Sequence, residues 1–465
     1  MACTLKALVD CRFRGNDSLY VQPAKAAQFQ NGLPSDTITS KSAEHYLTMH
    51  LRHLSLTHFR NYGRLELSLP PGPILLHGNN AQGKTNLLEA VYYLATTRSP
   101  HTYQDQQIIH WEANSLGLPV AVGRVVAEIE TEQGLTLVEL RLIQETRGSQ
   151  TTFRREALVN KRKVRLMDLL GTLRVVLFLP EDIQLITGAP ADRRRYLDIT
   201  LCQVDRAYCR TLSSYNKVLE QRNALLRQII ETGSGRDLLP IYTEKLVNLG
   251  SKIFAQRARQ MGTLAQESQD IHYEQLTGGQ ESLRLLYLPR LDENGSRSRD
   301  NESIEDLLEA AAWIQQVDEA EIASRFEASL HNAESGELQS STVIGPHRDD
   351  WTFWLNGRPL AQYGSRGQQR TAMLGLKLAE ITWMEALTGD KPILLLDEVV
   401  AELDERRRAL LLDVVSQSSQ AILTATDPTM FTPDFLQDAL TLRVNDGRII
   451  ESAPQPSPAP FPVDG

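Results

Sequence analysis

The feature that most constrains this chain is an eight-residue loop, Gly-Asn-Asn-Ala-Gln-Gly-Lys-Thr, at residues 78–85. The loop fits the phosphate-binding pattern G-x-x-x-x-G-K-[ST]. Residues 73–77 before it predict a short buried strand, and residues 86–94 after it predict a helix. The alternative, a chance glycine-rich turn before a helix, is disfavoured because strand, loop and helix follow in order. The sequence therefore predicts a nucleotide-binding α/β fold.

The residues of this loop have distinct expected roles. Its backbone N–H groups would point at phosphate oxygens, and the N-terminus of the following helix adds a partial positive charge. Lys84 would bridge the β- and γ-phosphates, and Thr85 would place its hydroxyl on Mg²⁺. The expected cofactors are therefore ATP and Mg²⁺. The loop residues expected to bind the nucleotide are Gly78, Asn79, Asn80, Ala81, Gln82, Gly83, Lys84 and Thr85.

An acidic pair far downstream forms a second candidate nucleotide element. Residues 392–396 are an apolar run that suits a strand of a parallel sheet, and Asp397 and Glu398 follow directly. Open α/β sheets bind ligands at this end of their strands. We expect Asp397 to hold Mg²⁺ through water and Glu398 to activate the attacking water, so Glu398 and Lys84 are the candidate catalytic residues. Alone, the pair would better suit the start of a helix.

A third segment, with Ser365, Gly367 and Gln368, opens a predicted helix roughly 30 residues before Asp397. These residues offer a hydroxyl and backbone N–H groups to an anion, and we expect them to bind nucleotide. The order of motifs is typical of ATP-binding-cassette ATPases, in which this signature motif completes the ATP site of a partner subunit. Residues 401–404 resemble the D-loop of that superfamily.

The strand predicted at residues 420–426 departs from the usual cassette pattern at its end. Many cassette ATPases carry a histidine there that senses the γ-phosphate. This chain has Thr426 and Asp427 instead. The departure puts vigorous hydrolysis in doubt, but it leaves nucleotide binding as expected.

Composition narrows the possible classes of protein. The chain has 465 residues, of which 41% are hydrophobic and 23% are charged, as in soluble globular proteins. No run approaches the roughly 18 apolar residues of a membrane span, so we expect a cytoplasmic protein with no membrane partner. The net charge of −9 requires any DNA-binding surface to be a local basic patch. The four cysteines, which form no CxxC pair, argue against a zinc hook; they are Cys3, Cys11, Cys202 and Cys209.

The pattern along the chain predicts an ATPase head split by a mostly helical insertion. Residues 49–190 and 336–451 would form the two parts of the head, and residues 191–335 the insertion. Residues 1–48 would be an extension that is either disordered or a mis-assigned start, with Met49 as the true start. The Pro-rich residues 452–465 would be a flexible tail.

Local patterns give the expected elements within these parts. Strands are expected at 65–69, 123–130, 136–142, 173–179 and 341–344, helices at 192–267 and 304–330, and a polar loop near 291–302. The side chains expected to share one helix face are Leu219, Leu225, Leu226, Ile229 and Ile230. Roughly 280 residues separate Lys84 from Ser365, a longer insertion than the ATPase subunit of a transporter has. No heptad repeat is long enough for the coiled coil of a long-armed chromosome ATPase.

Three stretches then identify a family. They are residues 56–62 with the phosphate loop and residues 98–102, residues 178–198, and residues 345–350 continuing into the signature and acidic segments. In these stretches the chain resembles the RecF family of bacterial recombination mediators, and the resemblance covers about residues 49–451. Ala189 and Ala401 stand where family members often carry Gly or Ser.

The resemblance implies a head like that of chromosome-maintenance ATPases, called lobe I, with an inserted lobe II. It implies an ATP-dependent homodimer that binds double-stranded DNA and junctions of single- and double-stranded DNA, and that hydrolyses ATP slowly. It also implies RecR and RecO as partners in loading RecA at single-strand gaps during recombinational repair and replication restart.

The residues themselves support DNA binding less strongly. The candidate phosphate contacts are Arg154, Arg155, Lys161, Arg162, Lys163, Arg165, Arg193, Arg194 and Arg195. A solvated charged face is an equal alternative for each cluster, and residues 406–408 better suit a surface or dimer interface. Two rival functions stay open: a DNA-independent cassette ATPase, such as a transporter-energising subunit, and a clamp that binds ATP without turnover.

Overall fold

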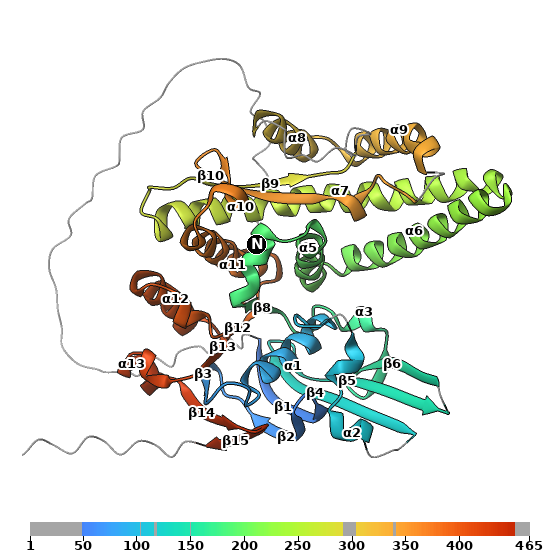
Figure 1. Cartoon of the computed structure of the whole chain (residues 1–465). Helices are drawn as coiled ribbons and strands as arrows, with labels where there is room; N and C mark the ends of the chain where they lie inside the picture. Colours follow the sequence, from blue (N-terminus) through green and yellow to red (C-terminus); the bar gives the residue numbers. More distant parts are fainter. Residues whose placement is uncertain are drawn as a thin grey trace, which may run out of the picture. The chain divides into compact units, whose positions relative to one another are not determined.

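A computed structural model describes residues 49–102, 104–115, 119–148, 150–291, 304–337 and 341–451 (Figure 1). The predicted extension at 1–48, the tail at 452–465 and nearly all of the polar loop expected near 291–302 lie outside these described residues. The described chain is an α/β fold with two six-stranded sheets, a three-stranded sheet and a set of long helices.

One six-stranded sheet carries the phosphate loop. Its strand order is β15-β14-β3-β13-β12-β8, and β14, β3, β13, β12 and β8 run parallel. Only β13 separates β3 from β12, so the carboxyl ends of these two strands lie close together at one edge of the sheet. The strands are β3 (Gly72–His77), β8 (Val175–Phe178), β12 (Ile393–Asp397), β13 (Gln420–Ala425), β14 (Leu440–Asn445) and β15 (Arg448–Glu451).

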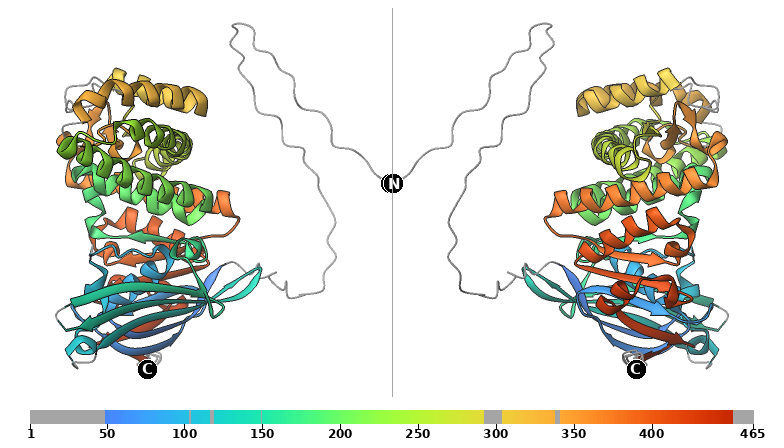
Figure 2. Two further views of the ribbon diagram at one scale, coloured as in Figure 1. Left: turned by 90° about the vertical axis from the view of Figure 1, so that its right-hand side faces the viewer. Right: turned by 90° about the vertical axis from the view of Figure 1, so that its left-hand side faces the viewer.

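The other six-stranded sheet is antiparallel, with the order β2-β1-β4-β5-β6-β7. Its long strands lie beside the parallel sheet in Figure 2. The expected strands at 65–69, 123–130 and 136–142 are confirmed within it, and those at 173–179 and 420–426 are confirmed in the parallel sheet. Its strands are β1 (His50–Phe59), β2 (Tyr62–Ser68), β4 (Val120–Thr131), β5 (Gly134–Arg147), β6 (Gln150–Val159) and β7 (Arg162–Val164).

Helix α1 (Lys84–Thr96) leaves the phosphate loop and packs between the two sheets. Its residues Ala90, Val91 and Leu94 belong to one apolar core with Leu54 of the antiparallel sheet and Ile74 of the parallel sheet. Burial of this apolar surface from both sides holds the helix, and with it the loop, in a fixed position.

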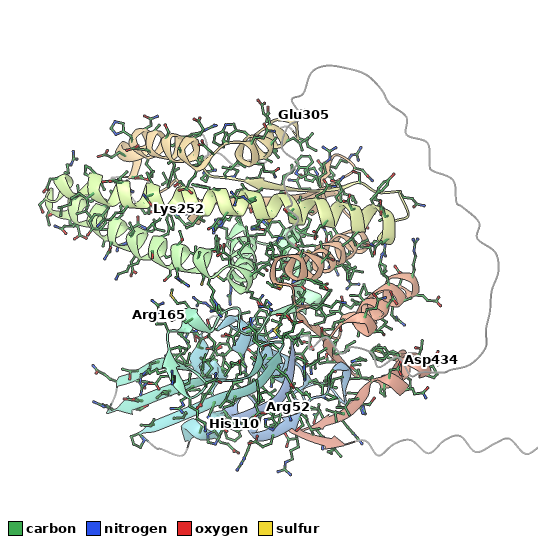
Figure 3. All side chains as sticks on the ribbon, turned by 180° about the vertical axis from the view of Figure 1, so that it is seen from behind. Arg52, His110, Arg165, Lys252, Glu305 and Asp434 are labelled. Carbon is green, nitrogen blue, oxygen red and sulfur yellow. The ribbon has the colours of Figure 1, made fainter. Side chains whose placement is uncertain are left out.

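The remaining long helices lie on the other side of the parallel sheet, and they confirm the helical patterns at 192–267 and 304–330 (Figure 1). They are α5 (Pro190–Val204), α6 (Arg206–Thr232), α7 (Leu239–Asp270), α8 (Ile304–Gln316), α9 (Glu319–Glu337) and α11 (Arg366–Thr388). Among them α11 packs on β8 and the others extend away from the sheet, with α8 and α9 beyond α7. Figure 3 shows Lys252, on α7, and Glu305, on α8, at the opposite end of the molecule from Arg52 and His110 of the head. No helix among the described residues is long and apolar enough to cross a membrane.

The shorter helices join these layers. They are α2 (Trp111–Ser115), α3 (Leu166–Leu169), α4 (Gln184–Thr187), α10 (Leu360–Tyr363), α12 (Glu405–Gln417) and α13 (Pro433–Asp438). A π-helical turn (Ile271–Leu276) extends the carboxyl end of α7. Cys202 and Cys209 are buried free thiols on α5 and α6, as expected of helix residues rather than ligands.

One predicted helix face is wrong at its edge. On α6, Leu225, Leu226 and Ile229 are buried against Leu239, but Ile230 is 49% exposed. At 100° per residue, Ile230 lies about 90° from the centre of the buried stripe.

The mostly helical insertion also contains a strand that the sequence analysis missed. Strand β9 (Leu283–Leu288) pairs antiparallel with β10 (Asp350–Leu355), which in turn pairs with β11 (Arg358–Pro359). The partner strand is distant in the sequence, so its hydrogen bonds leave no local signal near β9.

The strand expected at residues 341–344 is wrong, because those backbone groups bond to side chains instead of a neighbouring strand. The N–H of Thr342 donates to the Asn223 side chain (2.9 Å), and the N–H of Val343 donates to Glu337 (3.0 Å). These bonds tie the segment to helices α6 and α9.

Candidate nucleotide site

Two glycines let the phosphate loop adopt its conformation. Gly78 has a φ of +140° and Gly83 a φ of +112°, where L side chains are strained. A Cβ at Gly78 would lie 2.5 Å from the carbonyl oxygen of Val444, and one at Gly83 would lie 2.6 Å from the Asn61 amide. The loop therefore packs too tightly on β14 and on the turn after β1 for any residue except glycine.

The Lys84 ammonium lies folded over this loop. Its Nζ donates to the carbonyl oxygens of Gly78 (2.8 Å) and Asn79 (3.0 Å), and it lies 3.3 Å from Oε1 of Glu398. The side chain is only 3% exposed, so these three oxygens satisfy a cation that water hardly reaches. A phosphate oxygen is the kind of anion that this ammonium can bind in their place.

Thr85 and Asp397 meet at the bottom of the site. The Thr85 hydroxyl donates to Oδ1 of Asp397 (3.0 Å), and the Thr424 hydroxyl donates to the same oxygen (2.6 Å). Burial raises the pKa of Asp397, while the two hydroxyl donors oppose that shift. A hydroxyl beside a carboxylate is a hard oxygen donor set, which suits Mg²⁺ held by one or two protein ligands together with phosphates.

Glu398 is held at the mouth of the site by a strained backbone. Its φ of +53° is uncommon for a non-glycine residue, and its N–H donates to the Thr424 hydroxyl (2.9 Å). Its side chain is 39% exposed, in contrast to the buried Asp397. Such strain recurs where a side chain must be aimed at a ligand.

These residues line a cavity of about 400 Å³. The cavity brings together Lys84, Thr85, Asp397 and Glu398, as the sequence predicted. Its wall also includes His101, Pro180 and Glu181, which the sequence analysis did not name as site residues. The available signal was their place in residues 98–102 and 178–198, two of the stretches that carry the family resemblance.

Two further residues that support the loop were missed. The Tyr62 hydroxyl donates to the carbonyl oxygen of Gly83 (2.9 Å), and burial raises the pKa of Tyr62. The amide of Asn61 donates to the carbonyl oxygen of Gln82 (3.0 Å), which also accepts the N–H of Gly447 (3.0 Å). Asn61 and Tyr62 likewise end a stretch of the family resemblance, residues 56–62.

The signature residues lie elsewhere. Ser365 is the N-cap of α11: its hydroxyl accepts the N–H of Gln368 (3.2 Å), and the Gln368 side chain accepts the N–H of Ser365 (2.9 Å). This reciprocal capping box fixes the helix start. None of Ser365, Gly367 and Gln368 lines the cavity at the phosphate loop.

The segments after the acidic pair are held by local contacts. Asp404 caps α12 by accepting the N–H of Arg407 (3.0 Å), and Glu402 pairs with Arg370 of the signature helix (2.9 Å). The Thr426 hydroxyl donates to the side-chain oxygen of Asn80 in the phosphate loop (3.3 Å). Asp427 caps the turn that follows.

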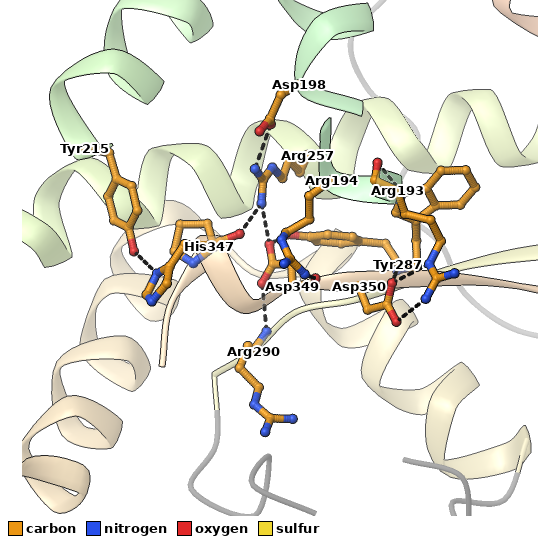
Figure 4. A network of polar contacts seen from close by, with 12 residues as sticks. Arg193, Arg194, Asp198, Tyr215, Arg257, Tyr287, Arg290, His347, Asp349 and Asp350 are labelled. Carbon is orange, nitrogen blue, oxygen red and sulfur yellow. Dashed lines mark hydrogen bonds and ion pairs between the residues drawn. The ribbon is translucent and has the colours of Figure 1, made fainter. Parts of the chain in front are cut away.

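Two arginines of the triplet at 193–195 take part in an interlobe network, which consists of Arg193, Arg194, Asp198, Arg257, Asp349 and Asp350 (Figure 4). The third, Arg195, donates to the backbone carbonyl of Ser99 (2.6 Å). Arg193 forms a bidentate ion pair with Asp350 (2.6 and 2.9 Å) and is 8% exposed. This buried pair is neither a solvated charged face nor a surface for DNA. The network joins two of the family stretches, residues 178–198 and 345–350.

The other basic candidates are mostly paired on the surface. Arg154 pairs with Glu145 and Glu156, and Arg155 pairs with Asp105. Further pairs are Lys163–Glu156 and Arg165–Asp168. Lys161 and Arg162 are exposed at the turn between β6 and β7.

The parallel sheet, the phosphate loop and the acidic pair define a P-loop ATPase head of the ATP-binding-cassette type, with long helices inserted in it. The family model for the RecF/RecN/SMC N-terminal domain matches residues 50–438. The DNA replication and repair protein RecF of Chloroflexus aggregans is 41% identical over 414 residues, which are 86% of this chain and 99% of that protein. The corresponding protein of Streptococcus uberis is 37% identical over 405 residues, again 86% of this chain and 99% of that protein.

A solved structure agrees. The recombination mediator protein RecF with ATP, from the RecFOR pathway, superposes with a TM-score of 0.73 at 29% identity and covers 88% of this chain and 100% of that one. The chain belongs to the RecF family of DNA replication and repair proteins.

Proposed function

We propose that this protein is an ATP-dependent DNA-binding protein of recombinational repair and replication restart that works as an ATP-linked homodimer. The observation that carries the proposal is the separation of the two halves of a cassette site within one chain. The phosphate loop lines its cavity with Asp397 and Glu398, whereas Ser365 opens a helix outside it. A second copy could supply the missing signature residues to each cavity, which gives two shared ATP sites in a two-fold dimer.

The chemistry follows from the residues at the cavity. Lys84 and the loop N–H groups would bind the β- and γ-phosphates, and Ser365, Gly367 and Gln368 would contact the γ-phosphate of the partner's ATP. Thr85 and Asp397 would hold Mg²⁺, which neutralises phosphate charge when bound. Glu398, whose carboxylate lies at the mouth, would accept a proton from the attacking water. Hydrolysis would be slow, since Thr426 and Asp427 stand where a γ-phosphate-sensing histidine is usual.

The family names support the biological role. Relatives are DNA replication and repair proteins, and the structural neighbour is a recombination mediator of the RecFOR pathway. We therefore propose double-stranded DNA and single-strand/double-strand junctions as ligands, RecR and RecO as partners in loading RecA, and the cytoplasm as location. Exposed Lys161 and Arg162 would contact DNA phosphates without reading bases.

Single-turnover ATP hydrolysis with and without duplex DNA tests this function, with Lys84→Met as the matched control. We expect slow hydrolysis, DNA binding that requires ATP, and loss of both in Lys84→Met. A transporter-energising subunit would instead ignore DNA and respond to a membrane partner. A clamp without turnover would bind DNA with ATP and leave the nucleotide intact.

A further inference from the structure

A larger cavity, of about 770 Å³, lies where the head meets α5, α6 and α7. Its walls come from the end of α1 and the following residues 96–102, from Arg155 of β6, from the α3 region and from the three long helices. It shares no lining residue with the cavity at the phosphate loop. Its volume lies within the range of about 300–1,000 Å³ that is typical of small-molecule sites.

The lining of this cavity is strongly cationic. Its charged residues are Arg98, Arg155, Arg165, Arg194, Arg195, Arg257, Asp105 and Asp198. Six positive charges face two negative charges in the lining, and Asp168 and Asp349, which pair with Arg165 and Arg257 just outside it, reduce the net charge from +4 to +2, in a chain whose total is −9. A concave surface of one sign concentrates counter-ions, so an anionic ligand is favoured there.

Two of these arginines keep unused hydrogen-bond donors. Arg194 donates to the backbone carbonyl of Asp349 (2.5 Å), and none of the described carboxylates lies within 4.0 Å of it. Burial lowers the pKa of Arg194 and Asp349 opposes this shift, while the neighbouring Arg257 lowers the pKa further. Arg98 is exposed, and its guanidinium has no partner among the residues that the structure describes.

The remaining arginines of the lining already have partners within the protein. Arg257 is paired with Asp198 and Asp349, and Arg155 is paired with Asp105. Arg165 is paired with Asp168, and Arg195 donates to the backbone carbonyl of Ser99 (2.6 Å). They shape the wall and offer the ligand little free charge. The rest of the wall is largely apolar, with Leu166, Met167, Leu170, Ile199 and Leu212. The cavity thus combines planar cations on one part of its wall with apolar surface on another.

We propose that this cavity binds a small phosphorylated ligand with an apolar or aromatic body, the chemistry of a nucleoside monophosphate. Arg98 and Arg194 would bind the phosphate, since the guanidinium fork matches a phosphate in geometry. The apolar wall would cover the body of the ligand. The site is distinct from the ATP site, although His101, in the segment that follows Arg98, lines the ATP cavity.

Isothermal titration of the full chain with thymidine 5′-monophosphate, and with thymidine as the matched probe without phosphate, tests the proposal. The titrations are run on the parent protein and on Lys84→Met, which disables the phosphate loop. We expect one monophosphate site per chain in both proteins and at least tenfold weaker binding of thymidine, as for the loss of charge-assisted hydrogen bonds.

Matched variants locate the site. Arg98→Glu should weaken monophosphate binding about tenfold or more, because Arg98 has no structural partner to lose. Arg236→Glu, an exposed arginine outside the lining, should leave binding unchanged. Cys202 and Cys209 line the cavity, so the monophosphate should also slow their reaction with a thiol reagent in the parent protein.

Three results would overturn the proposal. One is absence of monophosphate binding at millimolar concentration, and another is binding that Lys84→Met abolishes while Arg98→Glu leaves it intact. The third is loss of duplex DNA binding in Arg98→Glu without any monophosphate binding in the parent protein, which would make the cavity part of a DNA surface.

Discussion

The phosphate-loop cavity and the interlobe network both pair cations with carboxylates, but they differ in how completely those groups are satisfied. In the network, Arg257 donates to the Tyr208 hydroxyl, the Pro346 carbonyl and the carboxylates of Asp198 and Asp349, and it is 2% exposed. At the phosphate loop, Lys84 lies on two backbone carbonyls beside Glu398, whose carboxylate remains open to solvent.

This difference separates a structural role from a ligand-binding role. A buried charge whose donors are all used internally has no capacity for a ligand, and removal of its partner leaves an unpaired charge in the interior. A cation that rests on loop carbonyls can exchange them for phosphate oxygens. Substitutions of Arg257 and its partners should therefore change stability, and those at the phosphate-loop cavity should change turnover.

The largest expected effect is that of Arg257→Met. It leaves Asp349, which is buried, without its cation, so the free energy of unfolding should fall by about 3–5 kcal/mol. Urea unfolding measures the change. Arg259→Met, at an exposed position two residues further along α7, is the control and should change stability by less than about 0.5 kcal/mol. If both substitutions lowered the free energy of unfolding by the same amount, the structural role that we assign to the network would be wrong.

Glu398→Gln should slow ATP hydrolysis and leave the stability of the protein unchanged, the opposite of Arg257→Met. The amide keeps the size of the side chain but accepts no proton, so single-turnover hydrolysis should slow roughly 10²-fold. The urea midpoint should stay that of the parent protein, because the Glu398 side chain is part-exposed. Unchanged turnover would show that Glu398 has a structural role. The phosphate-loop cavity and the network would then not differ in the way described above.

His347, which lies beside the network in Figure 4, gives the stability of the protein a pH dependence. Its Nε2 lies 3.0 Å from the Thr342 carbonyl, which only accepts, so Nε2 carries the hydrogen and Nδ1 accepts from the Tyr215 hydroxyl (2.8 Å). Burial, with help from nearby arginines, lowers the pKa of His347 to about 4. The unfolded chain takes up this proton near pH 6.5, so stability is lost as the pH falls below that value.

The expected loss from His347 is about 2 kcal/mol between pH 7 and pH 5. Urea unfolding at the two pH values, on the parent protein and on His347→Gln, isolates this contribution from that of other groups. The variant should lose less stability than the parent over this interval. The same loss in both proteins would show that the imidazole does not stay neutral in the folded state.

Tyr62→Phe should have the smallest effect. It removes one buried hydrogen bond to the Gly83 carbonyl and keeps the ring, so about 1 kcal/mol of support for the loop is lost. ATP affinity should fall about fivefold, as equilibrium titration can measure. An unchanged affinity would mean that the glycines alone hold the loop.

The sequence predicted those parts of the fold and site that have local signals. The strand, loop and helix at residues 73–94 and the acidic pair after β12 depend on neighbouring residues, and both lie where they were expected. Family stretches marked the neighbourhood of Asn61, His101 and Glu181 without indicating what these side chains contact.

Apart from Ile230, whose place on α6 follows from helix geometry, the main errors share one physical cause: the residue that decides the structure lies far away in the chain. Strand β9 exists because β10 bonds to it, and Arg193 of α5 is buried because Asp350, more than 150 residues away in the sequence, pairs with it. No local pattern distinguishes such an arginine from one on a solvated face. Composition likewise gives no sign of the cationic cavity within an acidic protein.

The central claim is that ATP links two copies of this chain through a shared site. Sedimentation velocity of the parent protein and of Ser365→Arg, each with and without saturating Mg²⁺–ATP, tests it most directly. We predict a dimer only for the parent protein with ATP, and a monomer for Ser365→Arg that still binds ATP, because a bulky cation would replace a small hydroxyl at the interface. A parent protein that stays monomeric with ATP, or a Ser365→Arg variant that still dimerises, would contradict the account.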